Sequence, residues 1–488
     1  MVDLLPVLRV LGMLIVAFGL VMGFPLGVSL WENDGVWHIY PVCMAATTGV
    51  GLALAVGLRR YRSELMPRHG VMLVTLVWVV LPLCAVLPLM AALHATGRPI
   101  SFTHAYFEAV SGLTTTGSTV LSGLDELPVS VNVWRTYLQW AGGMGILILA
   151  VAVLPLLGVG GSQLFRAEAA GPVKDAKLTP RMTDTAKGLW GVYAFLSLTC
   201  AVAYWLGGMR PLDAVMHMFT TVSLGGLSPY DASFGHFRSP VLETIAVMFM
   251  LAASCNFALY FLAVRKRSLS GLWRDPELRA TLGVLVGSGL FVAGLLWVKG
   301  TYAPLDALRQ GMFHVVSIAT TTGYSTADYL QWPVFAPVFM LLLSGVATSA
   351  GSTGCGIKMV RVLILFKQAR REMTRLVHTR AVQPIRLGEA VIDSGVVFSV
   401  LAFMLVYGGT VVGLSMVLLL TDLDPVTAFS AVIASVNCMG PGMGAVGPAS
   451  NFGVLTDFQL WVCTLAMLLG RLEFLSVLAL LAPSFWRR

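Results

Sequence analysis

The sequence predicts an all-α polytopic membrane protein, with four pseudo-symmetric helix–pore loop–helix repeats around a central pore and two extra transmembrane helices before them. Hydrophobic residues make up 57% of the 488 residues and charged residues only 11%, whereas about 25% of an ordinary soluble domain is charged. Apolar stretches of about 20 residues, enough to cross a bilayer as a helix, recur along the whole chain. The third observation, a pattern that occurs four times, predicts the repeats.

Basic residues predict the orientation. They cluster after every second apolar run, and the positive-inside rule places such clusters, together with both termini, in the cytoplasm. Because the basic loops are short and scattered, they form no single face of the kind that binds nucleic acid. The clusters account for most of the 32 lysines and arginines and lie at 59–70, 166–187, 265–279, 358–386 and 487–488.

The chain divides into five predicted segments. Residues 1–69 contain an initial helical pair, at about 5–30 and 38–58, and the first apolar run has no cleavage site of a removed signal. Each later segment reads as a long apolar helix, a shorter semi-polar stretch and a second long helix. We therefore expect four pore repeats, with boundaries at 70–176, 177–274, 275–384 and 385–488.

The short stretch of each repeat has the features of a half-helix that enters the membrane from outside and turns back. Proline sets the turn at its start, and each stretch reaches a polar, glycine-containing turn in fewer than the about 20 residues that cross a bilayer. The side chains expected to cap the four half-helices are Ser101, Asp213, Asp306 and Asp424.

The polar turns are the candidate cation site. Irregular backbone at membrane depth is tolerated only where it lines a cavity or is buried in protein, so we expect the four turns to converge on one axis. Glycine allows backbone angles that direct carbonyls toward that axis, and a ring of carbonyls replaces the hydration shell of K⁺. The half-helix C-termini also favour a cation. The candidate residues are Thr115, Thr116, Gly117, Leu224, Gly225, Gly226, Thr321, Thr322, Gly323, Cys438, Met439 and Gly440, with Gly225 and Gly226 near-equal candidates for the second filter glycine.

The fourfold plan and its turn motifs, TTTGST, TVSLGGLSPYD, TTTGYSTADY and NCMGPGMGAVGPASNF, closely resemble the Trk/Ktr/HKT superfamily of potassium transporters, and the fit is best to the TrkH/TrkG branch. Residues 139–168, 351–368 and 468–474 also resemble that branch, so the likeness spans nearly the whole chain. It implies a K⁺-translocating subunit of the bacterial inner (plasma) membrane that forms a homodimer and works with a TrkA-like cytoplasmic regulator that binds nucleotides. The transported K⁺ is the only ligand expected, without a covalently bound cofactor.

Two units depart from the threonine pattern of the other two. Unit two has Ser223 and Leu224, and unit four has Asn437, Cys438 and Met439, where units one and three have threonines. A filter with strong preference for K⁺ over Na⁺ would be built from four like strands. The alternative function is therefore that of a less selective K⁺/Na⁺ transporter of the Ktr/HKT type.

A run of small residues in unit three, SGVATSAGSTGCG at 344–356, is expected to break its second long helix near the middle of the bilayer, because each glycine destabilises a helix by roughly 1 kcal/mol. The broken backbone would line the pore, whereas close helix packing is the alternative. The glycine spacing is that of a phosphate loop, but Ile357 stands where lysine is required. The predicted gate comprises Gly345, Ala347, Ala350 and Gly351 together with Lys358 and Arg471.

Arg471 lies within the final apolar run, where a charge costs at least about 2.5 kcal/mol and usually serves a function. We expect it to lie across the ion path with the broken segment and to form a gate under the control of the regulator. A structural pair or snorkelling is the alternative. Lys358 is either its companion or the mark of a cytoplasmic helix end.

The remaining polar residues do not indicate an enzyme. The sequence has no HExxH motif, no paired membrane aspartates and no serine with a partner histidine. An anion transporter would direct half-helix N-termini at its substrate, whereas these present C-termini. Glu108, His217 and His314 are expected to make structural hydrogen bonds. Asp125, Asp231 and Asp328 either attract cations to an outer vestibule or lie on solvated loops, and the seven cysteines are expected to be packing residues.

Overall fold

The computed structural model describes residues 4–61, 67–152, 182–379, 383–388 and 390–472, together with Phe474, Leu480 and Pro483. Most of the predicted basic loop at 166–187 lies outside these residues, as do the boundary at 176 and the terminal arginines. Within the described part of the chain, six helices are long and apolar enough to cross a membrane, or seven if one bent pair forms a single span. The predicted all-α polytopic membrane fold is confirmed.

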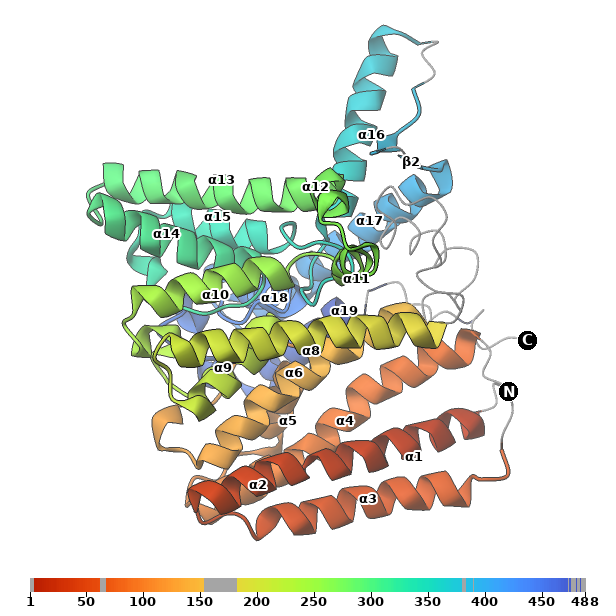
Figure 1. The fold of residues 1–488 in the computed structure, drawn as a ribbon, viewed down its shortest axis with the longest axis vertical. Coiled ribbons are helices and arrows are strands. Elements are labelled where there is room, and N and C mark those ends of the chain that lie inside the picture. Colours follow the sequence, from red (N-terminus) through yellow and green to blue (C-terminus); the bar gives the residue numbers. More distant parts are fainter. Residues whose placement is uncertain are drawn as a thin grey trace.

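Three helices form the N-terminal part of the bundle (Figure 1): α1 (Leu4–Val21), α2 (Gly23–Glu32) and α3 (Ile39–Gly57). Helix α1 packs against α3, where a Cβ added to Gly12 or to Gly51 would lie 2.8 Å from the carbonyl oxygen of the other glycine. Small residues therefore allow the two backbones to approach closely, as is common between membrane helices.

Four groups of helices follow, which we call units one to four. Unit one contains α4 (Pro67–Ala95), α5 (Phe102–Leu113) and α6 (Val129–Ala152), and unit two contains α8 (Met182–Leu206), α9 (Pro211–Val222), α10 (Pro240–Ala253) and α11 (Phe257–Lys266). Helix α12 (Ser270–Arg274) leads into unit three, which contains α13 (Pro276–Val298), α14 (Pro304–Ala319), α15 (Phe335–Ser344) and α16 (Met359–Val377). Unit four contains α17 (Ser394–Leu419), α18 (Pro425–Val436) and α19 (Asp457–Arg471).

The half-helices α5, α9, α14 and α18 lie in the interior of the bundle, and most of their residues are buried. The predicted caps are present in two of them. Ser101 accepts a hydrogen bond from the amide of His104, and Asp424 accepts one from the amide of Thr427. These contacts satisfy amides that the first helical turn leaves without partners.

The predicted caps Asp213 and Asp306 are wrong. The cap positions are held by Arg210 and Ala303, because proline follows each directly and its fixed φ suits the first helical position. Both aspartates instead lie inside the first turn, where a negative charge interacts favourably with the helix N-terminus.

The second long helix is interrupted in units two and three. Helices α10 and α11 meet at an angle of 85°, a bend that the sequence analysis did not predict. Asn256 caps α11 by accepting a hydrogen bond from the amide of Ala258. In unit three, α15 ends at Ser344 and α16 begins at Met359, so the predicted break is present.

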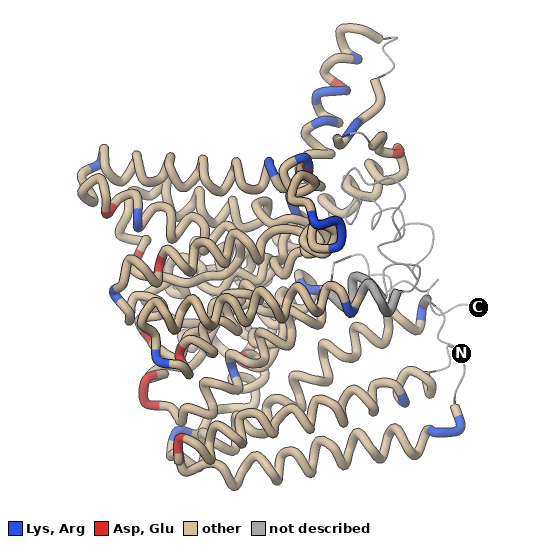
Figure 2. Tube along the Cα trace, viewed as in Figure 1, with Lys and Arg blue, Asp and Glu red and all other residues tan. Residues whose placement is uncertain are grey.

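Helix α16 projects beyond the bundle, and a short antiparallel ribbon of β1 (Arg386–Leu387) and β2 (Ala390–Val391) lies near its base (Figure 1). Basic residues are frequent along α16 and at the end of the bundle where α1 begins and α3 ends. Acidic residues gather mainly at the opposite end (Figure 2). This distribution has the asymmetry that the positive-inside rule associates with a membrane protein.

Candidate functional site

The four half-helices end in the same backbone motif. The residue after each C-cap has a positive φ: Thr115 (55°), Leu224 (55°), Thr321 (65°) and Cys438 (51°). The amide of the following residue donates to the carbonyl five positions earlier, at 2.8–2.9 Å in all four units. This is the Schellman arrangement, which glycine usually completes. A left-handed conformation costs other residues roughly 1–2 kcal/mol, and strain of this kind concentrates at functional sites.

A second positive φ follows two residues later, at Gly117 (83°), Gly226 (72°), Gly323 (85°) and Gly440 (94°). We call these four residues the glycine ring. Gly225 is not among the residues with positive φ, so Gly226 is the counterpart of the other three glycines. The geometry thus resolves an ambiguity that the sequence left open.

The glycine ring closes because each glycine faces a carbonyl of the next unit. A Cβ added to Gly117 would collide with the oxygen of Gly225, one on Gly226 with that of Thr322, and one on Gly323 with that of Met439. On Gly440 it would lie 3.2 Å from the oxygen of Thr116. The turns are therefore packed backbone against backbone in the order one, two, three, four, and they leave almost no room for side chains.

Burial of unpaired carbonyls distinguishes these turns from ordinary helix ends, whose free carbonyls face water. Within the part of the chain that the structure describes, the carbonyls of Thr115, Leu224, Thr321 and Cys438 accept no hydrogen bond, although these residues are at most 1% exposed. Buried carbonyls are nearly always paired with another group. Four equivalent carbonyl oxygens without a hydrogen-bond donor are suitable ligands for a cation, because cations coordinate oxygen directly.

Side chains form hydrogen bonds with the irregular backbone of the ring turns and of the segments that follow the ring glycines. The hydroxyl of Ser111 donates to the carbonyl of Ser118 at 2.6 Å, and that of Ser317 donates to Tyr324 at 2.7 Å. Helix α6 contributes Gln139, whose Nε2 donates to the carbonyl of Gly225 at 2.7 Å and whose Oε1 accepts from Leu227 at 3.1 Å. These hydrogen bonds hold the segments after the ring glycines in position.

The predicted structural role of Glu108, His217 and His314 is confirmed. Glu108 forms an ion pair of 2.7 Å with Arg135 of α6, and both side chains are 1% exposed. The same carboxylate accepts a hydrogen bond from the amide of Val120 at 3.0 Å.

The two histidines make comparable contacts. Nε2 of His217 lies 3.3 Å from the Ser228 hydroxyl, and Nε2 of His314 accepts from the amides of Thr326 and Ala327. Glu108, His217 and His314 therefore each connect their half-helix by a hydrogen bond to the loop that follows the ring glycine.

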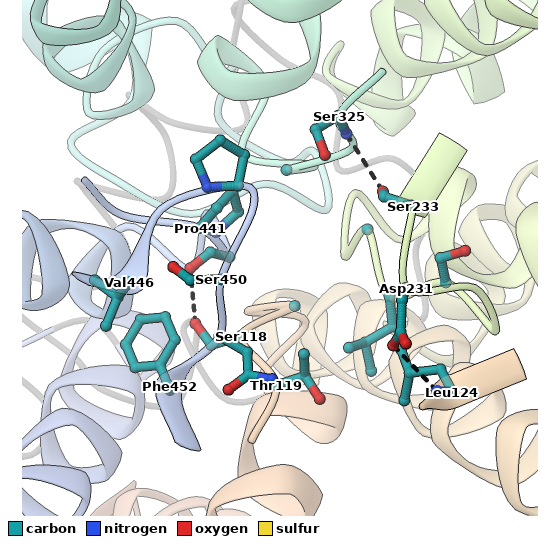
Figure 3. A pocket seen from close by; sticks show the side chains of 18 of the residues that line it. Ser118, Thr119, Leu124, Asp231, Ser233, Ser325, Pro441, Val446, Ser450 and Phe452 are labelled. Carbon is teal, nitrogen blue, oxygen red and sulfur yellow. Dashed lines mark hydrogen bonds between the residues drawn. The ribbon is translucent and has the colours of Figure 1, made fainter. Parts of the chain in front are cut away.

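A pocket opens directly above the glycine ring and is lined by all four of its glycines and by the loops that follow them (Figure 3). The Ser118 hydroxyl donates to the carbonyl of Gly440 at 2.8 Å, and the amide of Ser325 donates to Ser233 at 3.3 Å. Tyr230 also lines it; burial and Asp213 raise the pKa of Tyr230 to about 12. The tyrosine hydroxyl therefore remains a donor, and it contacts Asp213 at 3.0 Å.

The three aspartates predicted near a vestibule have structural partners. Asp231 lines the pocket and accepts hydrogen bonds from the amides of Gly123 and Leu124, while Asp125 accepts one from the amide of Asp231. Asp328 caps a short 3-10 helix at Leu330. These carboxylates connect or terminate loops, and Asp231 is the one of the three that faces the pocket.

The segment between α15 and α16, which we call loop 345–358, lies beneath the glycine ring. The Thr353 hydroxyl donates to the carbonyl of Val222 at the end of α9 at 3.1 Å, and a Cβ added to Gly354 would lie 3.3 Å from the Leu224 side chain. The loop therefore touches the ring turn of unit two directly.

Arg471 is fully buried and joins three parts of the molecule. Its guanidinium donates to the carbonyl of Thr353 at 2.9 Å and to that of Gly142 in α6 at 3.0 Å, and it lies 3.2 Å from Sγ of Cys355. The structure thus brings Arg471 and loop 345–358 together. Lys358 donates to the carbonyl of Gly354 within the same loop and precedes α16, so it marks the start of a helix rather than its end.

The other predicted residues of this loop anchor it. The carbonyl of Gly345 accepts from the amide of Ile357 at 2.6 Å, and Ala347 is completely buried. The amide of Ala350 donates to Glu277 at 2.7 Å, and the carbonyl of Gly351 accepts from the amide of Phe257 at 3.1 Å. The loop is therefore held by hydrogen bonds to α13 and to the bend between α10 and α11.

The sequence analysis missed Arg135, Gln139, Glu277 and Cys355. Arg135 and Gln139 occur within an apolar run, and this intramembrane polarity was a usable signal. Glu277 stands at the cytoplasmic-type start of a long helix, where a carboxylate is ordinary. Nothing in the local sequence indicates that Cys355 contacts Arg471.

Comparison with known proteins agrees with this geometry. The model of the TrkH family, described as cation transport proteins, matches residues 44–488. The Trk system potassium uptake protein TrkH of Vibrio parahaemolyticus is 43% identical over 484 residues, covering 99% of each chain. TrkG of Escherichia coli is 36% identical over 476 residues, covering 98% of this chain and 97% of that protein.

A solved structure shows the same fold. The crystal structure of the potassium transporter TrkH from Vibrio parahaemolyticus superposes with a TM-score of 0.91 at 40% sequence identity, covering 99% of this chain and all of that one. The relatives are transporters and not enzymes. The chain is a member of the TrkH family of cation transport proteins.

Proposed function

We propose that this protein takes up potassium ions across the bacterial inner membrane through the glycine ring. The observation that carries the proposal is the closed ring of four equivalent turns with unpaired, buried carbonyls. A ring of backbone oxygens can replace the hydration shell of a cation. The curated relatives TrkH and TrkG are potassium uptake proteins of the Trk system, which supports K⁺ as the ion.

The ion is expected to contact the turns at residues 115–117, 224–226, 321–323 and 438–440. A preference for K⁺ is expected to be moderate, because the side chains before the ring glycines differ between the units: Thr116, Gly225, Thr322 and Met439. A less selective K⁺/Na⁺ transporter of the Ktr/HKT type is the second candidate, and this chemical difference between units is the observation that favours it.

Arg471 and loop 345–358 are proposed to form the gate below the ring. At an effective dielectric constant of about 20, a unit positive charge 4 Å from the ion repels it by about 4 kcal/mol. The hydrogen bond from Arg471 to Thr353 couples this charge to the loop. Movement of the loop would therefore change both the width of the path and its electrostatic barrier.

A cytoplasmic TrkA-like, nucleotide-binding regulator is proposed to move the gate, and a homodimer is the proposed assembly. Helix α16 follows the loop directly, projects from the bundle and exposes both basic and apolar residues, among them Phe366 and Leu376. An exposed patch of mixed character marks an interaction surface. This proposal requires both chain termini and α16 to lie on the cytoplasmic side. The proposed boundaries of the four pore repeats are 70–176, 177–274, 275–384 and 385–488.

Rubidium uptake tests the central proposal. A strain that lacks its own potassium uptake systems should accumulate ⁸⁶Rb⁺ when it expresses this chain with its regulator, and excess K⁺ should suppress the uptake more strongly than excess Na⁺. Equal suppression by the two ions would instead support the less selective candidate. Uptake that does not exceed that of the empty vector, in cells where the protein is present in the membrane, would contradict both.

A further inference from the structure

Two of the four ring turns are held by hydroxyl pairs of their own. In unit one the hydroxyls of Thr114 and Thr116 are hydrogen bonded at 2.7 Å, and in unit three those of Thr320 and Thr322 are hydrogen bonded at 2.9 Å. The hydroxyls of Thr114 and Thr320 also donate to a carbonyl of their half-helix at 2.7 Å. Each pair therefore fastens the residue before the ring glycine to the end of the half-helix.

Unit two lacks this pair of threonines. Ser223 and Gly225 occupy the corresponding positions, and glycine has no hydroxyl to contribute. The space is filled instead by Gln139 of α6, which belongs to unit one and is completely buried. A Cβ added to Gly225 would have its three nearest neighbours in the Gln139 carboxamide, at 2.4–2.6 Å. Gln139 therefore occupies the place that a threonine side chain takes in units one and three.

The carboxamide of Gln139 holds the backbone on both sides of Gly226. Its Nε2 donates to the carbonyl of Gly225 at 2.7 Å, and its Oε1 accepts from the amide of Leu227 at 3.1 Å. The corresponding carbonyls of the other units accept no hydrogen bond within the described chain, namely those of Thr116, Thr322 and Met439. In unit two alone among the described ring turns, a side chain therefore fixes the direction of the carbonyl before the ring glycine.

The Gly225 carbonyl lies at the junction of units one and two. A Cβ added to Gly117 would lie 2.0 Å from the Gly225 oxygen and 3.6 Å from Nε2 of Gln139. The hydrogen bond from Gln139 therefore sets how closely the two turns approach, and with it the spacing of the carbonyls that replace water around an ion. A ring with one loose turn can contract around the smaller Na⁺, so discrimination between the ions requires each turn to be held in position.

We propose that Gln139 is a specificity-determining residue of ion transport: by holding Gly225 and Leu227, it replaces the missing threonine of unit two and prevents the glycine ring from contracting around Na⁺. Gln139 acts through the backbone and touches no ion, so it is a positioning residue. The inference rests on the proposed function, because it concerns the choice between ions that the ring admits. A purely structural glutamine would stabilise the fold without affecting that choice.

Gln139→Met tests the two hydrogen bonds, because methionine is similar in length but has no N–H donor and only a weak acceptor. The preference for K⁺ over Na⁺, measured from reversal potentials under bi-ionic conditions, should fall by about fivefold, the scale of one lost hydrogen bond. Gln310→Met in α14 is the matched control, because Gln310 is also buried but accepts from the loop side chain of Thr326 at 2.7 Å. Its selectivity should stay within about twofold of the natural value. Equal loss in both variants, or no loss in Gln139→Met, would overturn the proposal.

A compensating substitution distinguishes replacement of a threonine from simple packing. Gly225→Thr added to Gln139→Ala puts a hydroxyl near Ser223, as in units one and three, in the space that the shortened side chain leaves. Selectivity should fall in Gln139→Ala and return to within about twofold of the natural value in the double variant. Gly225→Thr alone should lose most of the folded protein, because its Cβ collides with Gln139. A double variant that folds but stays as unselective as Gln139→Ala would contradict the replacement.

Ion-dependent stability gives a measurement that needs no transport. An ion that binds the folded protein raises its thermal midpoint by mass action. The natural chain should therefore need less K⁺ than Na⁺ for the same rise, and the two concentrations should approach each other in Gln139→Met. A difference in the natural chain that persists in Gln139→Met would overturn the role of Gln139 and leave the proposed function intact. A natural chain that shows no difference and takes up no ⁸⁶Rb⁺ would contradict the proposed function itself, and the inference with it.

Discussion

In units one and four, which we call the intact units, the second long helix is continuous as far as its contact with the half-helix. In units two and three, which we call the broken units, it ends within the described chain and a further helix, α11 or α16, follows. In units one and four the contact is backbone against backbone, because a Cβ added to Gly142 of α6 would collide with the carbonyl of Leu113 and one added to Gly470 of α19 with that of Val436. In units two and three, α10 ends at Ala253 and α15 at Ser344.

The two interrupted units are held by hydrogen bonds to each other. The amide of Ser349 donates to the carbonyl of Ser254 at 3.0 Å, and that of Phe257 donates to Gly351 at 3.1 Å. One half of the ring is therefore supported by intact helices and the other half by two joined breaks. Because backbone outside a regular helix opens at lower free energy than a packed helix, movement is expected on the side of units two and three.

The largest expected effect follows from the tight contact in the intact units. Gly470→Val places a branched side chain against the Val436 carbonyl, and overpacking typically costs about 1–3 kcal/mol or more where backbone must move. We expect most of the folded, monodisperse protein to be lost in size-exclusion chromatography. Gly413→Val in α17, where an added Cβ meets nothing within 4 Å, is the matched control. Normal yield of Gly470→Val would show that the close contact does not support the half-helix.

The next effect concerns the arginine that connects the intact side to the broken side. Arg471→Ala removes a charge that would repel a nearby ion by about 4 kcal/mol, so K⁺ flux without the regulator should rise by about tenfold or more. Deletion of residues 347–350, which removes the Ser349 and Ala350 anchors of the loop, should raise it as well. Liposome flux per folded protein measures both.

The Arg471→Lys variant separates charge from hydrogen bonding. Lysine keeps the positive charge but loses the planar guanidinium that reaches Thr353 and Gly142 together. A gate based on charge should keep flux low in Arg471→Lys, while one based on the hydrogen bonds should open in it. A purely structural arginine would reveal itself by lower flux per folded protein in both Arg471→Ala and the loop deletion.

The contrast between the breaks also shows what the sequence could predict. The break after Ser344 was predictable because small residues and glycines are dense at 344–356. The bend at 254–256, with the sequence Ser-Cys-Asn, contains neither glycine nor proline, and it is held by hydrogen bonds to a distant loop. The local sequence can indicate where a helix is weak, but it does not show which distant segment supplies hydrogen bonds to the backbone where the helix is broken.

The glycine ring shows the same limit of sequence-based prediction at the level of single residues. The four glycines and the half-helices before them were predictable from length, turn residues and repetition. The positive φ of Thr115, Leu224, Thr321 and Cys438 was not, because the chemistry of these side chains does not favour it. Packing of the four units around one axis imposes that conformation, which explains why Gly225 and Gly226 became distinguishable only in three dimensions.

A smaller effect is expected from substitutions within the ring itself. A Cβ added at Gly323, in a broken unit, would collide with the carbonyl oxygen of Met439. A Cβ added at Gly440, in an intact unit, would lie 3.2 Å from the nearest carbonyl oxygen. Both have positive φ, so Gly323→Ser should reduce the preference for K⁺ over Na⁺ by about tenfold and Gly440→Ser by less. Reversal potentials under bi-ionic conditions measure this. Unchanged K⁺ over Na⁺ selectivity in a well-folded Gly323→Ser variant would show that the glycine ring does not determine ion selectivity.

The smallest expected effect uses two helix caps of the same kind. Asp424 caps the half-helix α18 of an intact unit by accepting from Thr427 at 2.9 Å, and Asn256 caps α11 at the bend by accepting from Ala258 at 2.9 Å. Replacing either by alanine should destabilise its helix by about 1 kcal/mol. Hydrogen bonds from the Thr427 side chain and amide lower the pKa of Asp424. Its contribution is therefore present above the pKa of the unfolded chain and is lost as the pH falls through the lower folded pKa.

The two caps should differ in what they change. Asp424→Ala should lower the thermal midpoint near neutral pH, lose that difference in acid, and leave Rb⁺ flux per folded protein unaltered. Asn256→Ala should lower the midpoint by a similar amount and also change flux, because the bend beside Asn256 holds loop 345–358 through Phe257 and Gly351. Asn256→Ser keeps a capping acceptor without adding a charge at this buried position, so it should behave like the natural chain. If the two alanine variants change flux equally, the broken side is no more mobile than the intact side, and the functional asymmetry between the units fails.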